Sequence, residues 1–286
     1  MNTQRIRVLL AAIECGSLTR AGEELGYTQS ALTQMVRSFE EEVGFPLLNK
    51  TTRGVTATPE AEQLLPTMRL ILSDEEKLDQ EISAICGIYR GRIRLGSFES
   101  TSAHWLPLVL KYFRSNYPDV VFQIEEYGHD ELLQGLLSGT LDMALMSDPG
   151  TNKVDFIPIY EDPLYVAFAP GHELSEYDKV PLKKLRDQPF IVESKDRDTY
   201  NVFARAGFEP DVRYYSKDSY AILSMAEQGL GIAVLPGLII ERFPGSYEYR
   251  PLDPGMSRLL GIGVRNIKRS GPLARFIIKY IQDNIG

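Results

Sequence analysis

Five polar side chains in one helical segment could read the edges of DNA bases. Gln29, Thr33 and Arg37 recur every four residues and so share one strip of a helix, with Ser30 and Gln34 beside it. Glutamine can bond adenine through two hydrogen bonds, threonine can meet the thymine methyl group, and arginine can reach guanine or phosphate. The spacing predicts a base-reading face. The alternative is the polar outer side of a helix in any small bundle.

The elements that position this strip follow from apolar spacing and capping residues. The pattern predicts three helices, at 5–14, 18–25 and 28–44. Ser17 and Thr28 can cap the second and third helices, and Gly26 supplies the stop between them. Gly22 lies inside the second helix, where glycine weakens a helix by up to about 1 kcal/mol. The sequence gives no reason for its presence.

A basic turn follows the third helix. Residues 52–55 read as a tight turn between two short strands, and the overlapping segment from Lys50 to Gly54 is basic. Its Lys50 and Arg53 predict a wing that contacts phosphate or a minor groove. Residues 1–60 nevertheless hold six basic and seven acidic side chains. Any phosphate-binding surface must therefore arise from where these charges lie.

A long amphipathic helix is predicted next. Thr58 can cap it, and Pro59 suits its first turn. Its apolar seam needs a cover, which is either its own domain or a coiled coil with a second copy. Pro66 indicates a kink or a later helix start. The seam comprises Leu64, Leu65, Met68, Ile71, Leu72, Leu78, Ile82 and Ile85.

From Arg90 onward the sequence alternates strands and helices. Apolar strands in βαβαβ order predict a parallel sheet with right-handed crossovers. A strand at 163–170 opens a second set, so we expect two α/β lobes with a cleft between them. The loop from Phe98 to Ser102 precedes a helix whose free N–H groups could bind an anion or a carbonyl. The alternative is ordinary N-capping by these hydroxyl side chains.

Composition narrows the class of protein. The 286 residues carry a net charge of −8, which argues against a generally basic nucleic-acid coat. No segment has the length of a membrane span and no export signal is evident, so we expect a cytoplasmic protein with reduced thiols at Cys15 and Cys86. The histidines lack metal-ligand spacing, and neither a dinucleotide fingerprint nor a Gly-x-Ser-x-Gly elbow occurs. We therefore expect no catalytic residue, no metal and no cofactor.

The chain resembles the LysR-type transcriptional regulators over almost its whole length. The N-terminal match runs through GSLTRAGEELGYTQSALTQMVRSFEEEVGFPLLNK and RGVTATPEA. GRIRLG, YPDV, LLSGTLDMAL and GLGIAVLP follow in the expected order. The resemblance implies an α/β protein with an N-terminal winged helix-turn-helix, a long linker helix and a two-lobed effector-binding domain like the type 2 periplasmic binding proteins.

The resemblance also implies domains and partners. We expect the DNA-binding domain at 1–58, the linker helix at 59–88 and the effector domain at 89–286. Lobe I would cover about 89–162 and 266–286, and lobe II about 163–265. The expected partners are double-stranded DNA, a small-molecule effector, RNA polymerase and further copies in a homodimer or homotetramer.

Site residues follow from the same resemblance and from the patterns above. The expected DNA contacts are Gln29, Ser30, Thr33, Gln34, Arg37, Lys50 and Arg53. The expected effector contacts are Ser100, Thr101, Ser102, His129, Ser147, Tyr200 and Phe203. Two other functions stay open: a solute-binding protein or enzyme on the same two-lobed scaffold, and a regulator without a small-molecule effector.

Overall fold

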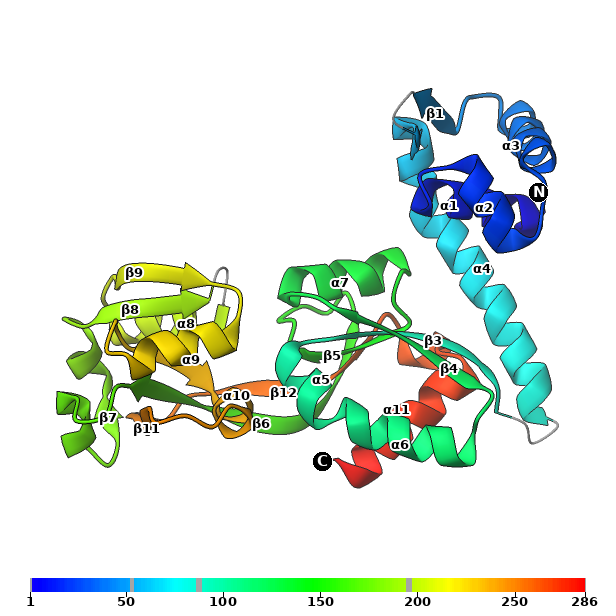
Figure 1. Cartoon of the computed structure of the whole chain (residues 1–286). Helices are drawn as coiled ribbons and strands as arrows, with labels where there is room; N and C mark the ends of the chain where they lie inside the picture. Colours follow the sequence, from blue (N-terminus) through cyan, green and yellow to red (C-terminus); the bar gives the residue numbers. More distant parts are fainter. Residues whose placement is uncertain (1, 52–53, 86–88, 194–196, 286) are drawn as a thin grey trace.

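The computed structural model describes residues 2–51, 54–85, 89–193 and 197–285. Along the chain it consists of an N-terminal helical unit, one long helix and two α/β lobes (Figure 1). The first part is a three-helix unit with a two-stranded wing. Its elements are α1 (Thr3–Glu14), α2 (Leu18–Leu25), α3 (Gln29–Val43), β1 (Leu48–Thr51) and β2 (Gly54–Ala57). The predicted caps are present, since the Ser17 and Thr28 hydroxyls accept from the amides of Arg20 and Ala31.

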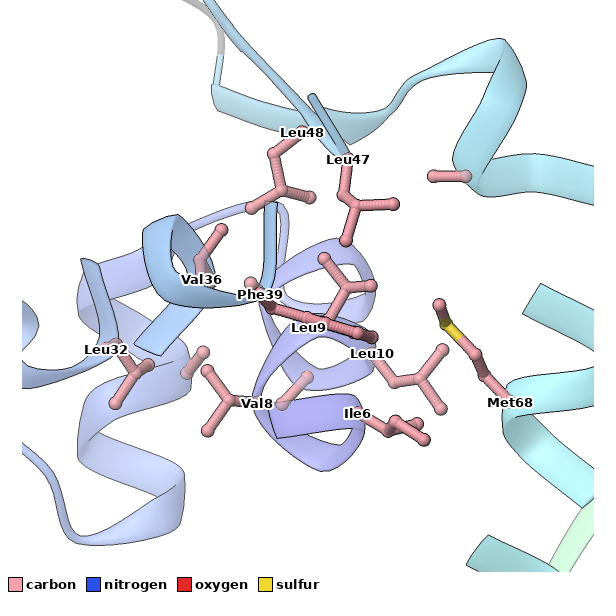
Figure 2. Packing of buried hydrophobic residues seen from close by; sticks show 14 of the residues in the cluster. Ile6, Val8, Leu9, Leu10, Leu32, Val36, Phe39, Leu47, Leu48 and Met68 are labelled. Carbon is pink, nitrogen blue, oxygen red and sulfur yellow. The ribbon is translucent and has the colours of Figure 1, made fainter. Parts of the chain in front are cut away.

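One apolar core holds these helices together (Figure 2). Leu9 of α1 and Phe39 of α3 are almost fully buried in it. Met68 reaches into the same core from the next helix, as Figure 2 shows. The wing is fixed by Glu40, whose carboxylate accepts from the amides of Leu47 and Leu48. α3 and the wing are therefore held in place by the same core and by Glu40.

The long helix α4 (Pro59–Ile85) is continuous and includes Pro66. The Thr58 hydroxyl caps it by accepting from the amide of Ala61, and donates to the carbonyl of Pro46. The apolar seam of α4 differs in solvent exposure between the two halves of the helix. The seam is buried at Leu65, Met68 and Leu72, and exposed at Leu78, Ile82 and Ile85. The first half of the seam thus packs on its own domain, and the second half is exposed to solvent.

Lobe I is built around three parallel strands, as predicted. They are β3 (Gly91–Ser97), β4 (Val120–Glu126) and β5 (Met143–Ser147). Helices α6 (Leu106–Asn116), α7 (His129–Ser138) and α11 (Pro272–Asn284), with the short α5 (Glu99–His104), pack around them (Figure 1). The sheet as a whole is mixed, because β12 (Ser257–Val264) joins β5 in the antiparallel direction.

A single long strand, β6 (Asp155–Phe168), runs from lobe I into lobe II. Its first residues pair with β12, and its last pair with β10 (Ala233–Pro236) and β11 (Glu248–Asp253). The sequence placed this strand eight residues too late, at 163, and missed β11. The β6–β12 pairing shifts register between Leu260 and Gly261. A Cβ at Gly261 would lie 2.1 Å from the carbonyl oxygen of Ile157, so only glycine fits there.

Lobe II completes its core with a separate pair of strands and three helices. β8 (Pro189–Glu193) and β9 (Asp211–Ser216) are parallel, and β7 (Val180–Pro181) lies beside β11. The helices are α8 (Arg197–Ala206), α9 (Ser219–Glu227) and α10 (Gly237–Arg242), the last of which was not predicted. Short 3₁₀ helices lie at Glu173–Glu176, Leu182–Leu185 and Ile267–Arg269.

The structure explains Gly22. A Cβ on this residue would lie 2.7 Å from the carbonyl oxygen of Tyr27, in the turn that leads into α3. The Tyr27 amide also donates to the Gly22 carbonyl, at 2.8 Å. The turn therefore folds directly back onto the helix, and its backbone occupies the space of a side chain.

We predict that Gly22→Ala destabilises the DNA-binding domain by about 1–3 kcal/mol, because the overlap outweighs the roughly 1 kcal/mol gain in helix propensity. Urea unfolding of the full chain measures this change. Glu23→Ala, at the exposed neighbouring position, is the matched control and should change stability by less than about 0.5 kcal/mol. A Gly22→Ala variant as stable as the parent would contradict the packing explanation.

Candidate nucleic-acid interface and interlobe site

The outer face of α3 is polar and open to solvent. Gln29, Ser30, Gln34 and Arg37 are exposed. Thr33 is half-buried, and its hydroxyl donates to the Gln29 carbonyl at 2.8 Å. Its methyl group rather than its hydroxyl is then available for a base contact. Gln29 and Gln34 are exposed, so their side-chain amides can turn toward a DNA groove.

Ser30 and Lys50, two further residues predicted to contact DNA, lie within the described structure. Ser30 shares a hydrogen bond of 3.1 Å with the capping hydroxyl of Thr28. Lys50 is exposed on β1, close in sequence to the tip of the wing. Arg53 lies outside the described residues, as does Cys86. Polar side chains of α3 and a lysine of the wing thus lie on one small domain.

Arg37 is held by a neighbouring carboxylate. Its Nε donates to Glu41 Oε1 at 3.0 Å, and both side chains are largely exposed. Such an i, i+4 pair contributes only about 0.3–0.5 kcal/mol, so DNA phosphate can displace it. The next glutamate, Glu42, pairs with Arg5 at 2.7 Å. These carboxylates at the end of α3 are therefore bonded to protein cations.

The second site lies where the two lobes meet. Arg197, the first residue of α8 in lobe II, places Nη1 3.0 Å from Nε2 of His129 on α7 in lobe I. His129 Nδ1 lies 3.2 Å from the hydroxyl of Ser147 at the end of β5. Because a guanidinium only donates, His129 Nε2 accepts and Nδ1 carries the proton, which it donates to Ser147. Burial, and then the charge of Arg197, lowers the pKa of His129.

A buried ion pair lies at the crossing between the lobes. Arg258 of β12 donates twice to the fully buried Asp162 of β6, at 2.8 and 3.0 Å. The same guanidinium donates to the Ser100 hydroxyl at 2.8 Å and lies 3.9 Å from Asp198 of α8. Asp162 also accepts from the amide of Leu238. These added hydrogen bonds satisfy charges that would be unfavourable if they were buried alone.

A third contact joins α5 to α9. The Ser219 hydroxyl donates to Glu99 Oε2 at 2.9 Å across the lobes. Burial raises the pKa of Glu99, and the nearby Asp218 and Glu126 act in the same direction. The interlobe surface therefore holds both signs of charge, with arginines and acids side by side.

The remaining predicted effector residues lie in different settings. Thr101 is fully buried and bonds Ser97 at 2.8 Å inside lobe I, while the Ser102 hydroxyl is buried without a hydrogen-bond partner among the described residues. Tyr200 is exposed on α8, and Phe203 is buried in the lobe II core against Phe190. The structure thus brings Ser100, His129 and Ser147 to the interlobe surface and places Thr101 and Phe203 in the cores of their lobes.

Sequence reasoning missed the charged members of the site. Glu99, Arg197 and Arg258 were not nominated, although Glu99 directly precedes the predicted Ser100, and the uncharged partner Ser219 was missed as well. Arg258 and Ser100 are separated by 158 residues, so only the fold shows that they meet.

Neither a metal site nor a membrane span is found in the described chain. Over residues 2–51, 54–85, 89–193 and 197–285, no group of three histidine, cysteine or acidic side chains could hold a metal ion. Within the same ranges, no helix is long and apolar enough to span a bilayer.

Comparison with known proteins finds matches to both the N-terminal helical domain and the two-lobed domain. Residues 3–62 match the bacterial regulatory helix-turn-helix model of the lysR family, and residues 87–286 match the LysR substrate binding domain. The chain is 26% identical over 291 residues to the HTH-type transcriptional regulator YvbU of Bacillus subtilis, covering 100% of this chain and 99% of that protein.

Two solved structures share the fold. A full-length variant of OxyR from Pseudomonas aeruginosa superimposes with a TM-score of 0.82 at 22% identity, covering 100% of this chain and 94% of that one. Full-length CbnR, solved with its target DNA, gives a TM-score of 0.67 at 20% identity and 99% coverage of both chains.

A winged helix-turn-helix joined by one long helix to a two-lobed substrate-binding domain defines a transcription regulator rather than an enzyme. The match of both family models across the chain makes the assignment specific. This chain belongs to the LysR family of transcriptional regulators.

The contact between Arg197 and His129 predicts a pH dependence. Because the folded protein holds His129 below its ordinary pKa of about 6.5, the unfolded chain binds more protons there, and stability falls as the pH drops below that value. We predict a smaller loss of melting temperature between pH 7 and pH 5 in His129→Gln than in the parent. Thermal melting of the full chain across this range measures it.

A second variant checks the cause. Arg197→Gln removes the cation beside the ring, so its melting temperature should also depend less on pH. If both variants lose as much as the parent between pH 7 and pH 5, then His129 is not responsible.

Proposed function

We propose that this regulator binds a two-fold-related DNA site as a dimer and that a small molecule between its lobes changes that binding. The observation that carries the DNA-reading part is the exposed strip of α3, where Gln29 and Gln34 have their amides free to turn outward. The solved CbnR complex with its target DNA, which shares this fold, supports the assignment.

The exposed turns of α4 supply the dimer contact in this proposal. Leu78, Ile82 and Ile85 project from the end of the helix, spaced three to four residues apart. Such a stripe is covered when a second copy of the helix lies along it. Two copies paired in this way carry two α3 helices, which suits half-sites in successive major grooves. We assign residues 1–58, 59–88 and 89–286 to DNA binding, pairing and effector binding.

The effector would act on the interlobe contacts. Arg197–His129 and Glu99–Ser219 each join a side chain of lobe I to one of lobe II. A ligand that replaced these contacts with its own would favour a different orientation of one lobe relative to the other. Modulation requires that the ligand bind one such arrangement more tightly than the other. Contact with RNA polymerase belongs to the same proposal, and no side chain is assigned to it.

The DNA-reading role predicts separate effects for two substitutions. Gln34→Ala should weaken binding to a genomic site by about 1–3 kcal/mol and relax the preference for one base. Arg37→Ala should weaken binding by a similar amount while changing stability by at most about 0.5 kcal/mol. Genome-wide mapping of bound sites supplies the fragments, and gel-shift titration at fixed salt measures the affinities.

Arg213→Ala is the matched control, because it also breaks an exposed pair, with Asp211, and removes one charge. It lies in lobe II and should bind DNA as the parent does. The assignment of this face is overturned if Gln34→Ala and Arg37→Ala bind every fragment with the affinity of the control.

The effector role predicts a ligand-dependent gain in stability. A screen of small organic acids and neutral metabolites should find a compound that raises the melting temperature of the full chain. Ser147→Ala should weaken that compound roughly fivefold, as expected for one lost hydrogen bond, and Ser115→Ala on the exposed face of α6 should not. A screen without any hit, on protein that binds DNA, would favour a regulator without a small-molecule effector.

A further inference from the structure

A cavity lies between α4 and lobe I, away from the interlobe contacts. It has a volume of about 370 Å³ and is lined by α4, β3, the end of α7 and the connection from β12 to α11. Volumes of this size hold small metabolites. None of its lining residues belongs to the Arg197, Arg258 or Glu99 contacts described above.

Positive charge is concentrated around this cavity. Arg92, Lys153, Arg265 and Arg269 line it and are exposed. Within the described part of the chain, none of the four has a carboxylate within 4.0 Å. These four cations gather around one hollow although the whole chain has a net charge of −8.

The acidic residues of the cavity are already engaged. Asp74 pairs with Lys77 at 2.9 Å, one turn along α4. Asp142 pairs with Arg94 at 2.7 Å, and Glu76 lies 3.7 Å from the same guanidinium. The carboxylates therefore leave the four cations unpaired, and the cavity retains an excess of positive charge.

The rest of the lining is neutral. Leu70, Ile93 and Leu141 contribute apolar surface, while Ser73 and Gln80 offer polar groups. Guanidinium groups bind carboxylate and phosphate oxygens through paired hydrogen bonds. From this combination we propose that the cavity is a second binding site, which takes a small organic anion carrying two or more carboxylate or phosphate charges.

The position of the cavity means that a bound anion would affect how α4 packs against lobe I. α4 packs closely on lobe I at two points, and the cavity lies between them. At one point Leu70 approaches Gly139, at the end of α7, and at the other Gln80 approaches Gly91 and Gly271. An anion in the cavity would touch both α4 and the cations of lobe I. It would therefore stabilise the present position of α4, which carries the DNA-binding domain, relative to lobe I.

The test is calorimetric titration of the full chain with citrate, glycerol 2-phosphate and inorganic phosphate, at constant ionic strength set with potassium chloride. We expect saturable binding of at least one probe, and the preferred probe shows whether carboxylate or phosphate is recognised. Arg269→Gln and Arg265→Gln should each weaken it roughly tenfold or more, as expected for a lost charge-assisted hydrogen bond.

Lys268→Gln is the matched control, because Lys268 is exposed between the two arginines and does not line the cavity. It should keep the parent affinity. Ser147→Ala should also keep it, which separates this cavity from the interlobe site. The proposal is overturned if no probe binds saturably, if the arginine variants bind as the parent does, if Lys268→Gln weakens binding equally, or if Ser147→Ala abolishes it.

Discussion

Two adjacent glutamates on α4 link this helix to the DNA-binding domain on one side and to lobe I on the other. Glu75 accepts from Thr3 and Arg7 of α1, each at 2.9 Å. Glu76 faces Arg94 of β3, which is itself fixed by Asp142. Successive residues of a helix point about 100° apart, so the two carboxylates serve different neighbours. These polar contacts add to the apolar packing of Leu65, Met68 and Leu72, so α4 is attached along its middle to both the DNA-binding domain and lobe I.

The lobes depend on a comparable arrangement at their crossing. Asp162 is inaccessible to solvent and takes two hydrogen bonds from Arg258 and one from the amide of Leu238. Removal of one partner from such a buried pair typically destabilises a protein by about 3–5 kcal/mol. Through Ser100 and Asp198, the same arginine touches α5 and α8. A buried structural group therefore forms the base of the surface where an effector is proposed to bind.

Most of the DNA-binding domain could be predicted from sequence because its signals are local. The caps at Ser17 and Thr28, the strip on α3 and the start of α4 each depend on residues within one or two turns. Pro66 was harder, since a proline inside a helix is compatible with a kink or with a later start, and the structure has one continuous helix. Gly22 could not be explained, because the backbone that excludes its side chain comes from the following turn.

The effector domain was predicted less completely because its interactions are long-range. The three parallel strands of lobe I followed from their alternation with helices, but the antiparallel partners β6 and β12 meet only in the folded chain. The same is true of the charged pairs at the interlobe surface. Arg197–His129 joins residues 68 positions apart, and Glu99–Ser219 joins residues 120 apart. From the sequence, hydroxyl groups near helix starts indicated a site. The charged residues that face them across the lobes could not be recognised as part of it.

The continuity of β6 through both lobes has a mechanical consequence. Between the lobes, β6 and β12 pair only with each other among the described strands, as an antiparallel ribbon at residues 161–163 and 257–259. Closer to lobe I, where β5 also pairs with β12, the β6–β12 register shifts beside Gly261. A ribbon of this kind yields to twisting far more readily than to stretching along its hydrogen bonds. The lobes would then turn about the ribbon axis like the ends of a torsion bar. The angle between the lobes could then change while the axis of rotation stays the same.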